Sequence, residues 1–145
     1  MKSIQLLFTA LVLTLLWGCE NVINENSSYD YVIEQKMECY CDQSGVWVKL
    51  YVSADTVSAA VRISDNSMVP YNEFKSYKSI KELFNIISET DTNKYNLVVQ
   101  YDTADNYPSF IYKNPKPIVI DDSTIVRIED AQISYTTRNF TKLEQ

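Results

Sequence analysis

The strongest constraint on the fold is a two-residue alternation of apolar and polar side chains that begins at Tyr29. Such alternation is typical of strands with one buried face. In the first segment, one face of an extended chain would carry Tyr29, Tyr31, Ile33, Met37, Cys39 and Cys41. The pattern recurs at 46–53 and 57–63, after short turn-forming stretches, the first of which ends at Gly45. Three antiparallel strands in a meander are therefore predicted.

One segment, 80–89, changes to a helical period. Its apolar side chains stand at i, i+3, i+4 and i+7, namely Ile80, Leu83, Phe84 and Ile87. Ser79 and Glu82 just before and inside this segment form a capping-box pattern, which satisfies two amides at a helix start. A helix over 80–89 is expected, with its apolar stripe buried against the sheet.

Period two returns at 95–101, before a turn in which Asn106 suits a left-handed conformation. It resumes at 109–113, and after two prolines a final extended stretch is expected over 123–135. The fold class predicted is α+β: an antiparallel β-sheet built from two three-strand meanders in the order βββ-α-βββ, with one helix packed on one face.

Residues 1–18 have the pattern of a lipoprotein signal peptide. Lys2 precedes an apolar run that ends at Trp17, shorter than the roughly 20 residues of a membrane-spanning helix. The run closes with Leu16-Trp17-Gly18-Cys19, which resembles the bacterial lipobox, in which the cysteine is acylated. An ordinary signal peptide or an uncleaved anchor is the alternative.

The lipobox divides the chain into three parts and predicts an export route. Residues 1–18 would be removed, 19–28 would be the acylated cysteine with a polar tether, and 29–145 would form a single domain. Several acyl chains hold a protein on a membrane stably. The expected location is therefore a bacterial membrane, the outer membrane if the cell is Gram-negative.

Composition excludes several function classes. The chain has a net charge of −6, with no basic cluster for a nucleic-acid partner. It has no histidine and only two glycines, which removes the commonest base, the commonest metal ligand and phosphate-cradling loops. Adjacent acidic pairs at 121–122 and 129–130 would point to opposite faces of a strand. No catalytic residues, metal site or cofactor are predicted.

Cys39 and Cys41 are the residues that most resemble a chemical site. With Cys19 acylated, these two remain as an even pair in an exported protein, and such pairs usually form disulfides. On a regular strand their Cα atoms would be about 6.6 Å apart, so a bond requires a bend at Tyr40. Free buried thiols, and a metal or redox site, remain alternatives, although zinc would require four ligands.

A second candidate site is an aromatic and basic row. Trp47, Lys49 and Tyr51 share one face of the second segment, opposite its valines. If the valines face the helix, this row faces outward, where it could bind a peptide or a sugar. The alternative is that both faces are covered or that the aromatic rings only stabilise the sheet.

An ordered set of short motifs runs through the whole expected domain. These are Tyr29-x-Tyr31 with Cys39-x-Cys41, Ser79-Ile80 with Leu83-Phe84, and Tyr101-Asp102 followed by Tyr107-Pro108. The set resembles a family of small bacterial secreted proteins and lipoproteins known only as a domain of unknown function. That family often has glycine where this chain has Asn106, and a helical lead-in where this chain has a short tether. The resemblance implies the fold and the exported location, and no activity.

Two functions are consistent with these observations. The first is a membrane-anchored, non-catalytic binding or scaffold module of the cell envelope, with the membrane and an envelope protein or glycan as partners. The second is a thiol redox or metal-handling protein that uses Cys39 and Cys41.

Overall fold

The structure is a computed structural model of the chain, in which residues 29–121, 124–126 and 131–143 are described. The predicted signal peptide, Cys19 and the tether lie outside these residues, as does the 129–130 pair. Among the described residues, no helix is long and apolar enough to cross a membrane.

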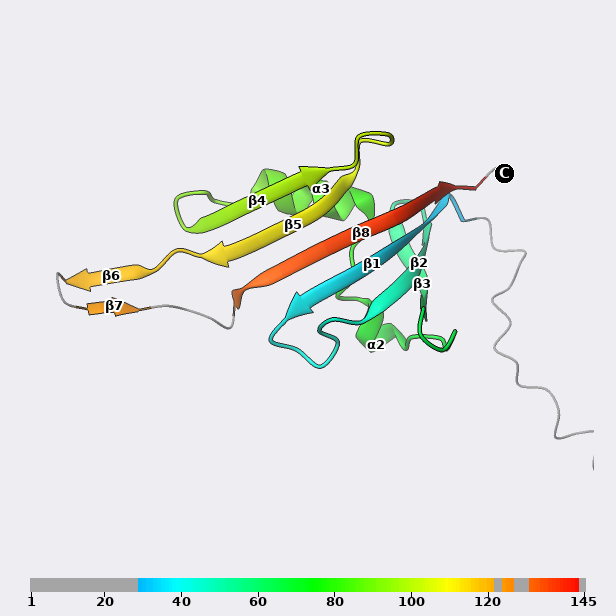
Figure 1. Cartoon of the computed structure of the whole chain (residues 1–145), viewed down its shortest axis with the longest axis horizontal. Coiled ribbons are helices and arrows are strands. Elements are labelled where there is room, and N and C mark those ends of the chain that lie inside the picture. Colours follow the sequence, from blue (N-terminus) through cyan, green and yellow to red (C-terminus); the bar gives the residue numbers. More distant parts are fainter. Residues whose placement is uncertain (1–28, 122–123, 127–130, 144–145) are drawn as a thin grey trace, which may run out of the picture.

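A six-stranded antiparallel sheet forms the body of the molecule (Figure 1). Its strand order is β3-β2-β1-β8-β5-β4. The strands are β1 (Tyr31–Cys39), β2 (Trp47–Ser53), β3 (Thr56–Arg62), β4 (Tyr95–Tyr101), β5 (Pro108–Pro115) and β8 (Ile133–Lys142). Two three-strand units are joined at the centre, where β1 pairs with β8. The predicted α+β fold is confirmed.

A small hairpin interrupts the second unit. β6 (Ile118–Asp121) and β7 (Thr124–Val126) pair only with each other and extend from one end of the main sheet (Figure 1). The prediction of one extended stretch over 123–135 is wrong here, because β7 belongs to this hairpin and β8 begins only at Ile133. Pro115 and Pro117 lack the amide hydrogen that a continuing strand would donate.

Two helices lie between the third and fourth strands in sequence. The short α2 spans Tyr71–Phe74, a segment for which the sequence predicted no helix. The second helix, α3, spans Ile80–Glu89 as predicted, and both hydrogen bonds of its capping box are present. The Ser79 amide donates to Glu82 at 2.8 Å, and the Glu82 amide donates to the Ser79 hydroxyl at 3.3 Å.

The core lies between these helices and one face of the sheet, here called the covered face. Leu83 of α3 belongs to the same buried cluster as Ile33 of β1, Leu50 of β2 and Ile111 of β5. The expected burial of the whole helical stripe is wrong at one position, because Phe84 is exposed and stacks on Tyr101 at the end of β4. Ile80, Ile86 and Ile87 are the partly buried residues of α3 that pack on the core.

Two polar residues, Gln35 and the helix N-cap Ser79, are completely buried beside this apolar layer. Gln35 of β1 donates from Nε2 to the Lys78 carbonyl at 3.0 Å and accepts from the Lys78 amide at 2.8 Å. Nearby, the Tyr31 hydroxyl accepts from the Ile80 amide at 2.9 Å, and the Tyr77 hydroxyl donates to the Val46 carbonyl at 3.1 Å. These bonds satisfy backbone groups that the core would otherwise leave without partners.

We predict that Gln35→Leu destabilises the domain strongly. The substitution leaves the partly buried Lys78 amide and carbonyl without their Gln35 partners, which should lower the free energy of unfolding by about 1–3 kcal/mol. Urea unfolding followed by Trp47 fluorescence measures this change. The exposed Gln132→Leu is the matched control and should change stability by less than about 0.5 kcal/mol. Equal effects of the two substitutions would contradict this role of Gln35.

Candidate functional site

The sheet face opposite α2 and α3, here called the open face, carries the predicted aromatic and basic row. Val48, Leu50 and Val52 are buried in the core, so Trp47, Lys49 and Tyr51 point away from the helices. Lys49 is exposed, while both aromatic residues are half-buried. Within the part of the chain that the structure describes, both helices lie on the covered face and neither covers this row (Figure 1).

Trp47 lies at the centre of a charged cluster. The Arg138 guanidinium of β8 lies 4.0 Å from the centroid of the Trp47 ring, and Lys36 Nζ lies 5.8 Å from it. Arg138 Nε also donates to Glu34 Oε2 at 2.8 Å. Cations over an indole face are attracted by its ring quadrupole, so the cluster holds Trp47 in a fixed environment.

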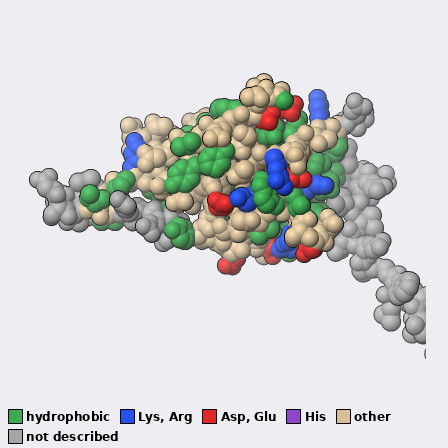
Figure 2. Space-filling view, viewed as in Figure 1, with side chains coloured by type: hydrophobic (Ala, Val, Ile, Leu, Met, Phe, Trp, Pro, Cys, Tyr) green, Lys and Arg blue, Asp and Glu red, His purple; other side chains and the backbone are tan. Residues whose placement is uncertain are grey.

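The two halves of the open face differ in character. Figure 2 shows hydrophobic side chains over β4 and β5, and basic and acidic side chains side by side over β1 and β8. The strand registers place Phe110, Tyr112 and Val98 in the first group. They place Glu34, Lys36 and Arg138 in the second. The open face therefore offers apolar and charged contacts within one surface.

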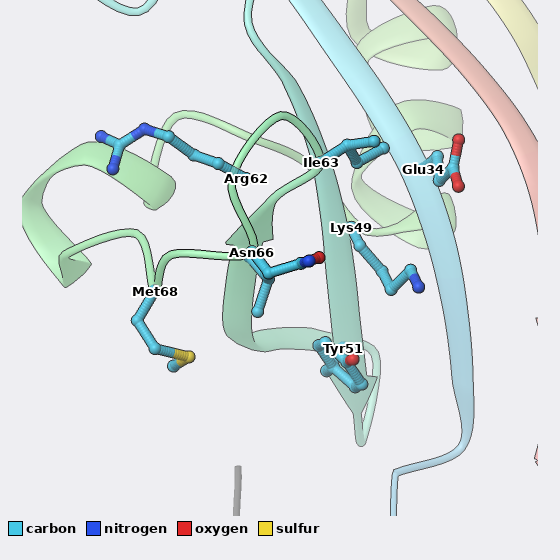
Figure 3. A pocket seen from close by; sticks show the side chains of 8 residues that line it. Glu34, Lys49, Tyr51, Arg62, Ile63, Asn66 and Met68 are labelled. Carbon is cyan, nitrogen blue, oxygen red and sulfur yellow. The ribbon is translucent and has the colours of Figure 1, made fainter. Parts of the chain in front are cut away.

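A hollow of about 230 Å³ lies at one side of the open face, between β2, β3 and the 63–69 loop (Figure 3). Lys49, Tyr51 and Asn66 present polar groups to it, whereas the Arg62 side chain turns toward α2 and binds Glu73 at 2.6 Å. Its remaining lining residues are Glu34, Val61, Ile63 and Met68.

The tyrosine in this hollow is held in its neutral form. Desolvation raises the pKa of the Tyr51 hydroxyl above its usual value, with a smaller contribution from Tyr29. The two rings lie 5.1 Å apart between centroids. A tyrosine hydroxyl is neutral at pH 7 even without this shift, so Tyr51 can donate a hydrogen bond there and keeps its proton to higher pH than usual.

Cys39 and Cys41 are joined by a disulfide, one of the alternatives left open by the sequence. Their Cα atoms are 5.3 Å apart, shorter than on a regular strand, because β1 ends at Cys39 and the chain bends at Tyr40. Gly45 has the positive φ of 78° expected for the following turn. The Ser44 hydroxyl also accepts from the Cys39 amide at 3.1 Å.

The disulfide lies at the surface rather than in the core. Cys41 is exposed, and an open hollow of about 290 Å³ runs along Glu38, Cys39 and Tyr40. A hydrogen bond and ion pair with Lys36 lower the pKa of the Glu38 carboxyl, which keeps it charged near the disulfide. Among the described residues, no three His, Cys, Asp or Glu side chains are grouped so that they could hold a metal ion.

Asp102, in the acidic turn before β5, binds backbone amides of that same turn. Asp102 Oδ1 accepts from the amides of Ala104 and Asp105, each at 2.9 Å. Asn106 has the left-handed φ of 56° that its position predicted. These residues close the hairpin between β4 and β5.

Sequence reasoning missed the charged partners of Trp47. Lys36 of β1 lies opposite Trp47 of β2, and nothing in the sequence placed the two together. Arg138 belongs to the last strand and reaches the site only because β8 pairs with β1. Knowledge of the strand order was needed to find this cluster.

The chain was also compared with known proteins. No curated protein and no solved structure matched it. One family model matches residues 21–142, a range that includes every strand and helix described above, and its description is a family of unknown function (DUF6174). The chain therefore belongs to this family of unknown function, in agreement with the resemblance seen in its motifs.

Proposed function

We propose that this protein is a lipid-anchored, non-catalytic binding module of the bacterial cell envelope, and that its open face holds a protein partner. The observation that carries the proposal is the open face itself. It presents Trp47, Lys49 and Tyr51 beside a hollow, and no described helix covers them. Exposed surfaces that combine aromatic and charged groups in this way are typical of binding sites.

The Trp47 environment favours a protein partner over a glycan. A sugar ring would stack on an uncovered aromatic face, but Arg138 already lies over this indole at 4.0 Å. Both signs of charge are present, on Glu34, Lys36 and Lys49. A protein surface can match alternating charges and also fill the hollow beside Tyr51.

The anchoring part of the proposal rests on the sequence before the domain. The lipobox-like Leu16-Trp17-Gly18-Cys19 supplies a cysteine for acylation and a small residue before it. A polar tether then separates Cys19 from β1, which begins at Tyr31. Such a chain would hold the domain in water at a membrane surface.

We predict that Cys19→Ser releases the protein from the membrane. The wild type expressed in a bacterium should incorporate labelled palmitate and sediment with membranes, whereas this variant should do neither, because the acylated thiol is absent. A double substitution, Cys39→Ser with Cys41→Ser, is the matched control and should keep both label and sedimentation. Labelling of Cys19→Ser at the wild-type level would refute the anchor.

A second prediction concerns the open face. Full-length protein bearing Lys49→Glu and Tyr51→Ala should capture its envelope partner at least tenfold less well than wild type, as measured by quantitative pull-down from membrane extract. Lys81→Glu with Tyr71→Ala makes the same chemical changes at exposed positions on the helices and should leave capture unchanged.

Two outcomes would oppose this proposal. If the control pair on the helices lost the partner as completely as the open-face pair, the open face would not be the binding surface. Co-sedimentation of wild type with purified peptidoglycan, abolished by Lys49→Glu with Tyr51→Ala, would identify a glycan ligand instead of a protein.

A second candidate function is thiol–disulfide exchange at Cys39 and Cys41. The observation that favours it is the surface position of the disulfide beside an open hollow, where another thiolate could reach a sulfur atom. A bond across a single intervening residue closes a very small loop, and such loops constrain the unfolded chain little.

The two candidates predict different results when both cysteines are replaced by serine. For the binding module, partner capture is retained and the free energy of unfolding falls by only about 1–2 kcal/mol, as expected for so short a loop. Urea titration and the same pull-down measure both quantities. Loss of disulfide-exchange activity with a model dithiol substrate, in a variant that still folds, would support the second candidate.

A further inference from the structure

The two edge strands of the main sheet, β3 and β4, differ in whether another segment pairs with their outer side. At the β3 edge, the following loop returns and pairs with the strand through a bridge between Val61 and Met68. The Arg62 amide donates to Ser67 and the Val69 amide donates to Ala60, each at 2.9 Å. Within the described part of the chain, β4 has no comparable segment along its outer side.

β4 also lacks the features that usually protect an edge strand. Its sequence, YNLVVQY, contains no charged residue and no proline. Native edges commonly carry lysine, proline or a bulge that prevents pairing with another chain. The register shift between β4 and β5 is confined to the end of the strand, at Gln100/Tyr101.

The hydrogen-bonding groups of β4 that face outward can be assigned from its pairing with β5. The Lys116 amide donates to the Lys94 carbonyl at 2.8 Å. Because hydrogen-bonded residues alternate along an antiparallel pair, the backbone groups of Asn96, Val98 and Gln100 point toward β5. The backbone groups of Leu97 and Val99 therefore face away from the sheet. The Tyr95 amide also faces outward and is already used, by the Asp91 carbonyl at 3.0 Å.

Exposed apolar side chains gather at the same edge. Val98 and Tyr101 of β4 are 48% and 49% exposed, and Phe84 of α3 is 40% exposed. The rings of Phe84 and Tyr101 are stacked with centroids 6.2 Å apart. Apolar side chains therefore flank the outward backbone groups on both faces of the sheet.

We propose that β4 pairs antiparallel with β4 of a second copy of this chain, about a two-fold axis at Val98. In this register Leu97 of each copy lies opposite Val99 of the other, and their outward amides and carbonyls bond reciprocally. The two Val98 side chains meet on the open face. The result is a continuous sheet across two copies, which is an isologous interface.

The charges that flank β4 are compatible with this partner. The strand is preceded by Lys94, whose side chain is 77% exposed with Nζ 3.8 Å from Asp91 Oδ2, and followed by Asp102, whose Oδ1 accepts from the amides of Ala104 and Asp105. Pairing about Val98 places Lys94 of one copy opposite Asp102 of the other, twice. Between Lys94 and Asp102, β4 has no charged side chain that would face a like charge in the second copy. A second copy of this chain thus matches the edge in hydrogen bonding, apolar contact and charge.

Cysteine cross-linking in membranes that contain the full-length protein tests this register. Val98→Cys should form an intermolecular disulfide under mild oxidation, because directly opposite residues have Cβ atoms about 4.5–5.5 Å apart. Asn96→Cys and Gln100→Cys should each fail to cross-link alone, but should cross-link to each other when co-expressed. These exposed positions are matched in strand and in face.

Three results would overturn the proposal. The first is absence of a Val98→Cys cross-link while Trp47 fluorescence shows a folded protein. The second is equal cross-linking of Asn96→Cys alone and Val98→Cys, which would indicate random collision. The third is a Val98→Cys adduct with a different protein, which would assign the edge to another partner.

A charge on the axis provides an independent measurement. Val98→Lys places two ammonium groups opposite each other and should shift detergent-solubilised protein from dimer to monomer in sedimentation velocity. Lys49→Glu lies on β2, which three strands separate from β4, and should leave the protein dimeric. The dimer and the open-face partner can therefore be tested separately. A monomeric wild type in this measurement would also refute the interface.

Discussion

The architecture depends on a buried pair of hydrogen bonds between Gln35 and the backbone of Lys78. An amide side chain in an apolar layer is costly unless both of its ends are satisfied, and Lys78 supplies an acceptor and a donor in the required arrangement. Because Lys78 directly precedes the N-cap of α3, this contact fixes where the helix starts above the sheet. Tyr31 strengthens the same junction through the Ile80 amide.

The position of the helices determines which sheet face is left for function. With α3 held on the covered face, the alternation of β2 directs Trp47, Lys49 and Tyr51 to the other side. The pairing of β1 with β8 then brings Arg138 over Trp47. The open-face cluster is therefore a consequence of strand order, and every one of its charges comes from a regular strand instead of a loop. Groups held on rigid strands lose little conformational entropy when a partner binds.

Local patterns in the sequence were sufficient for most of the secondary structure. The period of the apolar residues and the Ser79–Glu82 box located α3 at its observed ends. Gly45 and Asn106 located two turns through their backbone preferences. The errors arose where tertiary context decides. Phe84 fits the helical stripe but stacks on Tyr101 of the edge strand β4 and stays exposed, because no further described strand lies outside β4 to cover it.

The candidate site was harder to predict than the fold, because it depends on contacts between distant segments. Arg138 belongs to the last strand, and only the pairing of β8 with β1 brings it to Trp47. The extended stretch after Pro117 could not be divided from its sequence, since the β6–β7 hairpin and the start of β8 have similar composition. The disulfide between Cys39 and Cys41 could be predicted only in part. The sequence shows that the bond requires a bend at Tyr40, and the structure contains both the bend and the bond.

The central position of β1 and β8 has a further consequence for a protein anchored as proposed above. The chain enters the domain beside the point where it leaves, since the Leu143 amide donates to the Asp30 carbonyl at 3.0 Å (Figure 1). A tether attached at Asp30 therefore begins at the middle of the sheet. In strand order β4 is separated from β1 by β8 and β5, and β3 is separated from it by β2. The loop after β3 occupies the Ala60–Arg62 part of the β3 edge. Among the described residues β4 has no such segment, so strand pairing between two copies anchored as proposed above would use β4.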